Sequence, residues 1–135
     1  MIVLVAEDEP ITSFVLAGEL KRAGHSVLGP VTNTSDALQL VEECRPDVAL
    51  IEIELDGDYA GIELARQLST MGIPCVYASA RSTLARENAS SALGYLAKPY
   101  NPESIAEIFE IIKEAVSGAP LQQLRIPPAL EIFGR

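Results

Sequence analysis

The stretch PDVALIEIELDGDYAGIELARQL, residues Pro46 to Leu68, decides the fold class. Its first part, VALIEI, is a mostly apolar run that is short enough for a strand buried on both faces. A loop rich in Gly and Asp follows, and then Leu64, Ala65 and Leu68 recur with the spacing of one helix face. The stretch therefore predicts a strand, a loop and a helix, which together form the repeating unit of parallel sheets.

The same unit recurs along the chain. Strands are predicted at residues 2–6, 26–30, 47–53, 74–79 and 94–97. Helices are predicted from Pro10 to near Gly24, after the capping run TNTSD at 32–36, over 60–71, over 83–92 where the apolar pattern is weak, and after the cap Asn101. Strict alternation of five such units predicts an α/β fold, a doubly wound five-stranded parallel sheet with helices on both faces.

The first and last helices differ in their apolar patterns. The first carries Ile11, Phe14 and Val15 on one side, whereas the last has a long stripe from Ile105 to Val116. After Gly118 the pattern stops, and three prolines interrupt an otherwise apolar segment. The chain is therefore predicted to be one domain over residues 1–117, followed by a tail over 118–135 that is either docked or flexible.

Composition excludes several classes of protein. A formal net charge of −9 and a pI of about 4.5 argue against nucleic acid and anionic membranes as direct partners. No apolar run approaches the length of a membrane span, and MIVLVA at the N-terminus is too short for a signal peptide. Cys44 and Cys75 lack metal-ligand spacing and are predicted to be near-core residues, and His25 a surface residue. A cytoplasmic location is expected.

Polar side chains gather where the predicted strands end. Glu7 and Asp8 follow the first strand, Glu52 lies at the end of the third, Ser79 ends the fourth, and Lys98 follows the fifth. Functional groups of open α/β sheets lie beyond these carboxyl ends. Three carboxylates there repel one another unless a cation intervenes, so Lys98 together with Mg²⁺, which prefers oxygen ligands, is the expected counter-charge. The set suits phosphoryl chemistry.

These motifs in this order resemble the receiver domain of bacterial two-component response regulators. The resemblance rests on VLVAEDEP, PDVALIEIEL, GIELARQL, PCVYASA and GYLAKPYNPESI, over roughly residues 1–117. It implies a flavodoxin-like (βα)5 fold with strand order 2-1-3-4-5, and a signalling module rather than an enzyme. It also implies that Mg²⁺ is held by Glu7, Asp8 and the backbone carbonyl of Glu54, and that Tyr95 is a switch residue that turns inward on activation.

Two departures from the family pattern affect the expected function. The phosphoacceptor position holds Glu52 where the family has aspartate, so the longer carboxylate is expected to reach Lys98 and Ser79 and to mimic part of the phosphorylated state. The interval from Ser79 to Lys98 is 19 residues, shorter than is typical of the family. The shortened part is the weak fourth helix, which belongs to the family's output and dimerisation face and is expected to be remodelled or covered by the tail.

The resemblance therefore predicts an atypical stand-alone receiver domain in phosphorelay signal transduction. Its expected partner is a sensor histidine kinase or another signalling protein, with a homodimer as an alternative. A phosphorylatable receiver whose acceptor aspartate was replaced by Glu52 stays open as a second interpretation, as does the loss of Mg²⁺ from a site that Glu52 fills. A Mg²⁺-dependent phosphohydrolase is disfavoured because the run Glu7-Asp8-Glu9 lacks the paired aspartates of that class.

Overall fold

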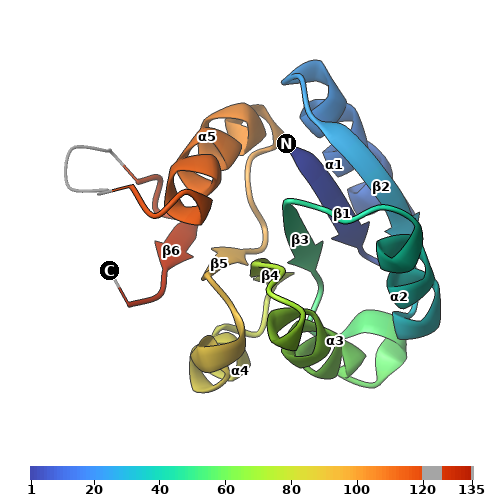
Figure 1. Ribbon diagram of the computed structural model, residues 1–135. Coiled ribbons are helices and arrows are strands. Elements are labelled where there is room, and N and C mark those ends of the chain that lie inside the picture. Colours follow the sequence, from blue (N-terminus) through green and yellow to red (C-terminus); the bar gives the residue numbers. More distant parts are fainter. Residues whose placement is uncertain (120–125, 135) are drawn as a thin grey trace.

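The computed structural model describes residues 1–119 and 126–134 as one six-stranded sheet covered by helices (Figure 1). The strands are β1 (Ile2–Ala6), β2 (Ser26–Val31), β3 (Val48–Ile51), β4 (Cys75–Ser79), β5 (Gly94–Ala97) and β6 (Leu130–Ile132). Their order across the sheet is β2-β1-β3-β4-β5-β6. The first five are parallel, which confirms the predicted strand order, and β6 pairs antiparallel with β5.

Five helices cover the two faces of this sheet. They are α1 (Pro10–Arg22), α2 (Thr34–Glu43), α3 (Ala60–Thr70), α4 (Ser82–Glu87) and α5 (Ile105–Val116). One apolar core lies between the sheet and the pair α1 and α5, and the other lies between the sheet and α2, α3 and α4. Short 3₁₀ turns at Leu55–Gly57, Ala89–Ser91 and Pro102–Ser104 complete the connections. None of these helices is long and apolar enough to cross a membrane.

The sixth strand was not predicted. It is formed by part of the predicted tail, because Leu130 and Ile132 are buried and pair with β5. Residues 120–125 and 135 of that tail lie outside the described residues. The fourth helix is only six residues long, in keeping with its weak apolar pattern.

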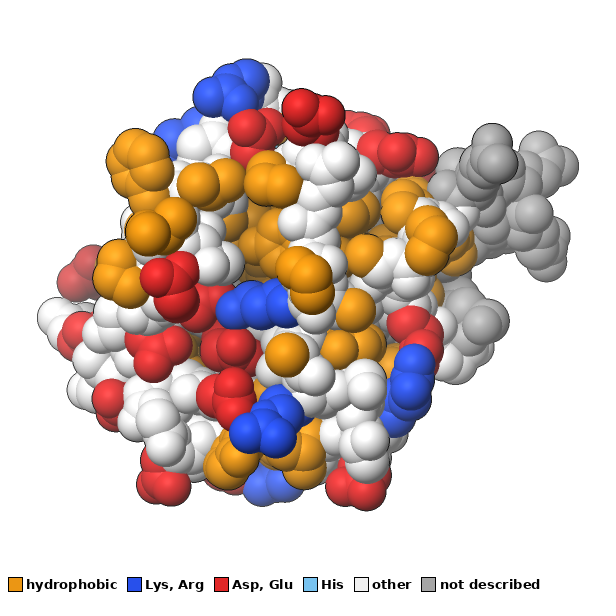
Figure 2. All heavy atoms as spheres, turned by 180° about the vertical axis from the view of Figure 1, so that it is seen from behind, with side chains coloured by type: hydrophobic (Ala, Val, Ile, Leu, Met, Phe, Trp, Pro, Cys, Tyr) orange, Lys and Arg blue, Asp and Glu red, His pale blue; other side chains and the backbone are white. Residues whose placement is uncertain are grey.

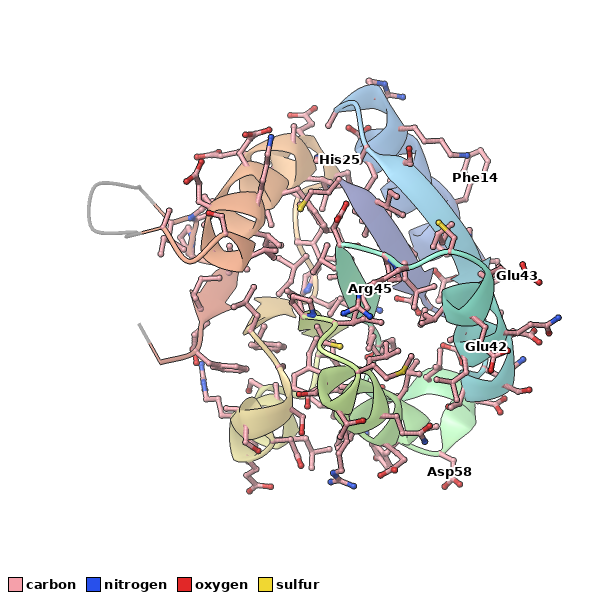
Figure 3. The ribbon with its side chains drawn as sticks, in the orientation of Figure 1. Phe14, His25, Glu42, Glu43, Arg45 and Asp58 are labelled. Carbon is pink, nitrogen blue, oxygen red and sulfur yellow. The ribbon has the colours of Figure 1, made fainter. Side chains whose placement is uncertain are left out.

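The apolar side of α1 faces outward. Ile11 is 74% exposed and Phe14 is 80% exposed, and Figure 3 shows Phe14 on the outer side of its helix. The helix packs instead through Leu16, Ala17 and Leu20, with Ser13 buried beside them. Burial of Ser13 is compatible with this packing because its hydroxyl donates a hydrogen bond to the carbonyl of Pro10 at 3.0 Å.

The prediction that His25 lies on the surface is wrong. His25 is 8% exposed, its Nδ1 lies 3.0 Å from the amino group of Met1, and its ring is 5.8 Å from that of Phe109 on α5 (Figure 3). Burial, followed by the positive amino group, lowers the pKa of His25. The imidazole is therefore part of the packing between the start of β2 and α5.

The two cysteines are expected to differ sharply in reactivity. Burial raises the pKa of the Cys75 thiol to about 12, so its reactive thiolate is scarce, whereas Cys44 is only half-buried. A thiol reagent should modify Cys44 in the folded protein and leave Cys75 intact, as followed by intact mass. The same reagent in denaturant provides the control and should modify both. Equal rates at the two thiols in the folded protein would contradict this assignment.

Candidate functional site

The central feature of the site is a lysine bridge between two buried carboxylates. Glu7 follows β1, Glu52 follows β3, and Lys98 follows β5, so the parallel sheet brings the three together at its carboxyl edge. The ammonium of Lys98 donates hydrogen bonds to Glu7 and, at 3.0 Å, to Oε1 of Glu52. Glu7 is 4% exposed and Glu52 is 7% exposed, so these charges interact largely away from water.

The protonation of the bridge follows from these contacts. Burial raises the pKa of Glu7, and the hydrogen bond and charge of Lys98 limit that rise. Burial alone would lower the pKa of Lys98, but the hydrogen bonds and charges of Glu7 and Glu52 outweigh it, so its pKa is raised. Lys98 therefore stays protonated at neutral pH and supplies the counter-charge that the carboxylates need.

Glu52 is held on both of its carboxylate oxygens. Lys98 binds Oε1, and the backbone N–H of Glu54 donates a long hydrogen bond to Oε2 at 3.4 Å. The backbone carbonyl of Glu52 packs against Gly61 at the start of α3, where an added Cβ would lie 2.0 Å from the carbonyl oxygen. Only glycine fits at this position, and Gly61 thereby fixes where Glu52 leaves the sheet.

Ser79 and Tyr95 form a second set of contacts beside the bridge. Ser79 is fully buried, and its Oγ accepts a hydrogen bond from the backbone N–H of Arg81 at 3.2 Å. The Tyr95 side chain points inward, is 3% exposed, and donates its hydroxyl hydrogen bond to the carbonyl of Ser79 at 2.8 Å. Glu52 therefore reaches Lys98 as predicted, whereas the Ser79 hydroxyl is bonded by the backbone of Arg81.

Sequence reasoning missed Arg81, which lies just after β4 and contacts residues of the site. Its Nε donates to the carboxylate of Glu54 at 2.7 Å, and its guanidinium lies 5.7 Å from the centre of the Tyr59 ring. Arg81 thus connects the loop after β4 to the loop after β3. A basic residue two positions beyond the hydroxyl that ends a strand was the signal available in the sequence.

Two of the expected magnesium ligands already have hydrogen-bond partners in this arrangement. Glu7 is bonded by Lys98, Asp8 is exposed, and the carbonyl of Glu54 accepts a hydrogen bond from the N–H of Gly57 at 3.0 Å. Among the described residues, no group of three His, Cys, Asp or Glu side chains could hold a metal ion. In this arrangement Lys98 balances part of the charge of Glu7 and Glu52, a role that a bound cation would share.

An apolar groove of about 380 Å³ opens beside the bridge. Its walls come from the start of α1 and from the segment after β5, and include Ile11, Val15, Pro99, Tyr100 and Pro102. Figure 2 shows hydrophobic side chains gathered next to basic side chains that are flanked by acidic ones. Ile11 on the groove wall and Phe14 nearby on α1 are largely exposed, so the start of this helix presents apolar area to solvent.

The chain is similar to known proteins over most of its length. The response regulator receiver domain family matches residues 3–110. The transcriptional regulatory protein PdtaR of Mycobacterium tuberculosis is 30% identical over 118 residues, which cover 85% of this chain and 56% of that protein. The positive alginate biosynthesis regulatory protein of Pseudomonas aeruginosa is 33% identical over 136 residues, which cover 96% of this chain and 53% of that protein.

A solved structure shows the same architecture. The signal receiver domain of a modulated diguanylate cyclase from Desulfovibrio desulfuricans G20 matches with a TM-score of 0.74 and 28% identity, covering 87% of this chain and 94% of that one. The chain spans about half the length of the two curated relatives that it matches. By the match over residues 3–110, the chain belongs to the response regulator receiver domain family.

Proposed function

We propose that this receiver domain acts in phosphorelay signalling with a switch held by the Glu7–Lys98–Glu52 bridge rather than by phosphorylation. The observation that carries the proposal is the hydrogen bond from Lys98 to Glu52, at the position where the family has its acceptor aspartate. The longer glutamate side chain brings a carboxylate directly to the lysine. That contact provides an anion for Lys98 without a phosphoryl group.

Phosphate transfer to Glu52 is disfavoured by the same contacts. A carboxylate nucleophile must approach the phosphorus in line, and both oxygens of Glu52 are held by hydrogen-bond donors. Misplacement of a reacting group by about 1 Å can lower a rate by about 100-fold. The proposal therefore assigns Glu52, Ser79 and Lys98 a role in setting the conformation of the domain, and it assigns no catalytic step.

The bridge also supports a site that works without Mg²⁺. In this arrangement Lys98 balances part of the charge of Glu7 and Glu52. The hydroxyl of Tyr95 reaches the carbonyl of Ser79 in the inward position that the family resemblance associates with activation. The proposed state is thus a partly activated one, which we call a pseudo-receiver state, maintained by residues of the chain itself.

Docking on a partner protein is the proposed means of signalling. The apolar groove beside Lys98 and the exposed Phe14 offer a contact surface on the side of α1. The acidic charge of the chain favours a partner with basic residues around an apolar segment. The proposed partner is a sensor histidine kinase or another signalling protein in the cytoplasm, with self-association as the alternative.

A phosphorylatable receiver altered at one residue is the second candidate. It is favoured by the presence of Glu7, Asp8, Ser79 and Lys98, the other residues that the family resemblance assigns to the site, after the expected strands. In this interpretation, aspartate at position 52 would restore the acceptor. The two candidates differ in whether Glu52 is the native residue, and they share the same surrounding site.

The test is intact mass spectrometry after incubation with acetyl phosphate and Mg²⁺. The unaltered protein should gain no phosphoryl group, whereas Glu52→Asp should gain one, because the shorter carboxylate leaves room for in-line attack. Glu54→Asp is the matched control, since it shortens a neighbouring carboxylate and leaves Glu52 in place. A stable phosphoryl group on Glu52 itself would refute the proposal. If Glu52→Asp also gains no phosphoryl group, Glu52 is not what prevents phosphorylation. In that case only the proposed docking on a partner protein stands.

A further inference from the structure

The edge of β5 has the features of a peptide-recognition site, and β6 occupies it. Gly94, Tyr95 and Leu96 pair with Ile132, Glu131 and Leu130 in antiparallel register. The backbone N–H of Ala97 donates to Ala129 at 2.8 Å, and that of Phe133 donates to Leu93 at 2.9 Å. Figure 1 shows β6 at the outer edge of the sheet, between α5 and α4. These backbone contacts would accept any extended segment.

Side-chain contacts make the edge selective. Leu130 and Ile132 are buried in the core that α5 covers, whereas Phe133 packs against the core that contains Tyr95. Between them, Glu131 accepts hydrogen bonds from the guanidinium of Arg86 on α4, at 3.1 Å and 3.2 Å. The chain's own segment on this edge therefore has the pattern apolar, acidic, apolar and aromatic over four consecutive residues.

Gly94 provides the space that this pairing needs. A Cβ at Gly94 would lie 2.5 Å from the carbonyl oxygen of Glu131, closer than real Cβ atoms approach. Any larger residue at position 94 would therefore push the bound segment away from β5. Glycine at position 94 is therefore required for β6 to pair with β5 as it does.

We propose that the β5 edge is a binding site for an extended peptide segment with this pattern, supplied in cis by Leu130–Phe133 and in trans by a partner protein. Only three residues of β6 are paired, so the cis segment is held by a short ladder. Short elements that are held by few backbone hydrogen bonds open at low cost in free energy. A partner segment can then compete for the same edge by strand addition.

Occupancy of the edge is coupled to the site through Tyr95. The backbone of Tyr95 pairs with Glu131, while its hydroxyl binds the carbonyl of Ser79 next to the lysine bridge. Replacement of the chain's own segment by a partner segment therefore changes the contacts of Tyr95, which connects β5 to the bridge. The inference goes beyond the proposed function, since it holds whether or not Glu52 accepts phosphate.

The test uses a labelled peptide with the sequence of residues 126–134, titrated into full-length proteins and followed by fluorescence anisotropy. In Ile132→Asp the chain's own strand cannot bury residue 132, so the edge is free. In the unaltered protein the cis segment competes at an effective concentration on the order of millimolar. Ile132→Asp should thus bind the peptide at least about tenfold more tightly than the unaltered protein.

Two further variants identify the site of binding. Adding Gly94→Val to Ile132→Asp should abolish binding, because the valine blocks the peptide backbone. Adding Arg86→Glu to Ile132→Asp should weaken binding of the unaltered peptide several-fold. The same protein should bind a peptide that carries Glu131→Lys more tightly than the unaltered peptide. If Ile132→Asp does not fold, Glu131→Pro replaces it, since proline opposes pairing in a strand while Ile132 is kept. Equal weak binding by the opened and unaltered proteins, or full binding despite Gly94→Val, would overturn the proposal.

Discussion

Replacement of Lys98 by methionine is expected to lower the free energy of unfolding by about 3–5 kcal/mol at pH 8. The lysine side chain is 19% exposed and holds two carboxylates that are themselves 5% and 9% exposed. Methionine fills a similar volume but leaves Glu7 and Glu52 buried without a cation. The loss of stability comes mainly from these two uncompensated charges rather than from lost packing.

The size of this effect should depend on pH. Burial raises the pKa of Glu7 above its ordinary value of 4.5 in the folded protein. For an acid with a raised folded pKa, the stabilising contribution is complete below the unfolded pKa and is lost as pH rises through the folded pKa. Without Lys98 the pKa of Glu7 rises further, so the stability that is lost as pH increases is larger. The deficit of Lys98→Met should therefore be greatest at pH 8 and shrink towards pH 5.

Urea unfolding at pH 5 and pH 8 measures both the loss of stability in Lys98→Met and its dependence on pH. Lys21→Met is the matched control, because it removes an exposed lysine at the end of α1 and should change stability by no more than about 1 kcal/mol. Adding Glu7→Gln to Lys98→Met should restore part of the lost stability by removing one buried charge. A Lys98→Met deficit that is small and independent of pH would mean that the bridge contributes little.

Gly61→Ala is expected to lower the free energy of unfolding by about 3 kcal/mol. An added methyl group would lie 2.0 Å from the carbonyl oxygen of Glu52 and 2.8 Å from the Cα of Ile53. Both neighbours are backbone atoms of the segment after β3, which a side-chain rotation cannot move. Relief of the clash requires α3 or this segment to shift, and a shift would also displace Glu52 from Lys98.

Gly18→Ala provides a control of opposite sign. Gly18 lies inside α1, and no neighbouring atom lies within 4 Å of the position that an added methyl group would take. Alanine there should stabilise the helix by about 0.5–1 kcal/mol, which is the usual gain over glycine. Denaturant unfolding gives the free energy of unfolding of both variants, and so compares the same glycine-to-alanine substitution in α3 and in α1. Equal stability of Gly61→Ala and Gly18→Ala would show that the close approach to Glu52 is not maintained in solution.

The parallel part of the fold could be predicted because its strands are continuous apolar runs. β1 and β5 have the predicted bounds, and β3 and β4 lie within theirs. β6 escaped prediction because three paired residues next to several prolines have no detectable period. The burial of His25 depends on Phe109, which is far away in sequence, so a local turn motif could not reveal it.

The site was predictable in its residues and less so in its contacts. The end of each strand indicates which side chains gather at the carboxyl edge, and Glu7, Glu52 and Lys98 do meet there. The partner of each side chain depends on loop geometry that composition does not encode. Arg81 shows this, since its backbone binds the hydroxyl of Ser79 while its side chain binds Glu54.

The separation of β5 and β6 along the sequence has a consequence for synthesis. β5 is complete at Ala97, but the strand that covers its edge begins at Leu130. At a translation rate of roughly 5–20 residues per second, the covering strand is made a few seconds after β5. During that interval the edge that β6 later covers is open to other nascent or unfolded chains. The exposure is limited because β5 has only four residues.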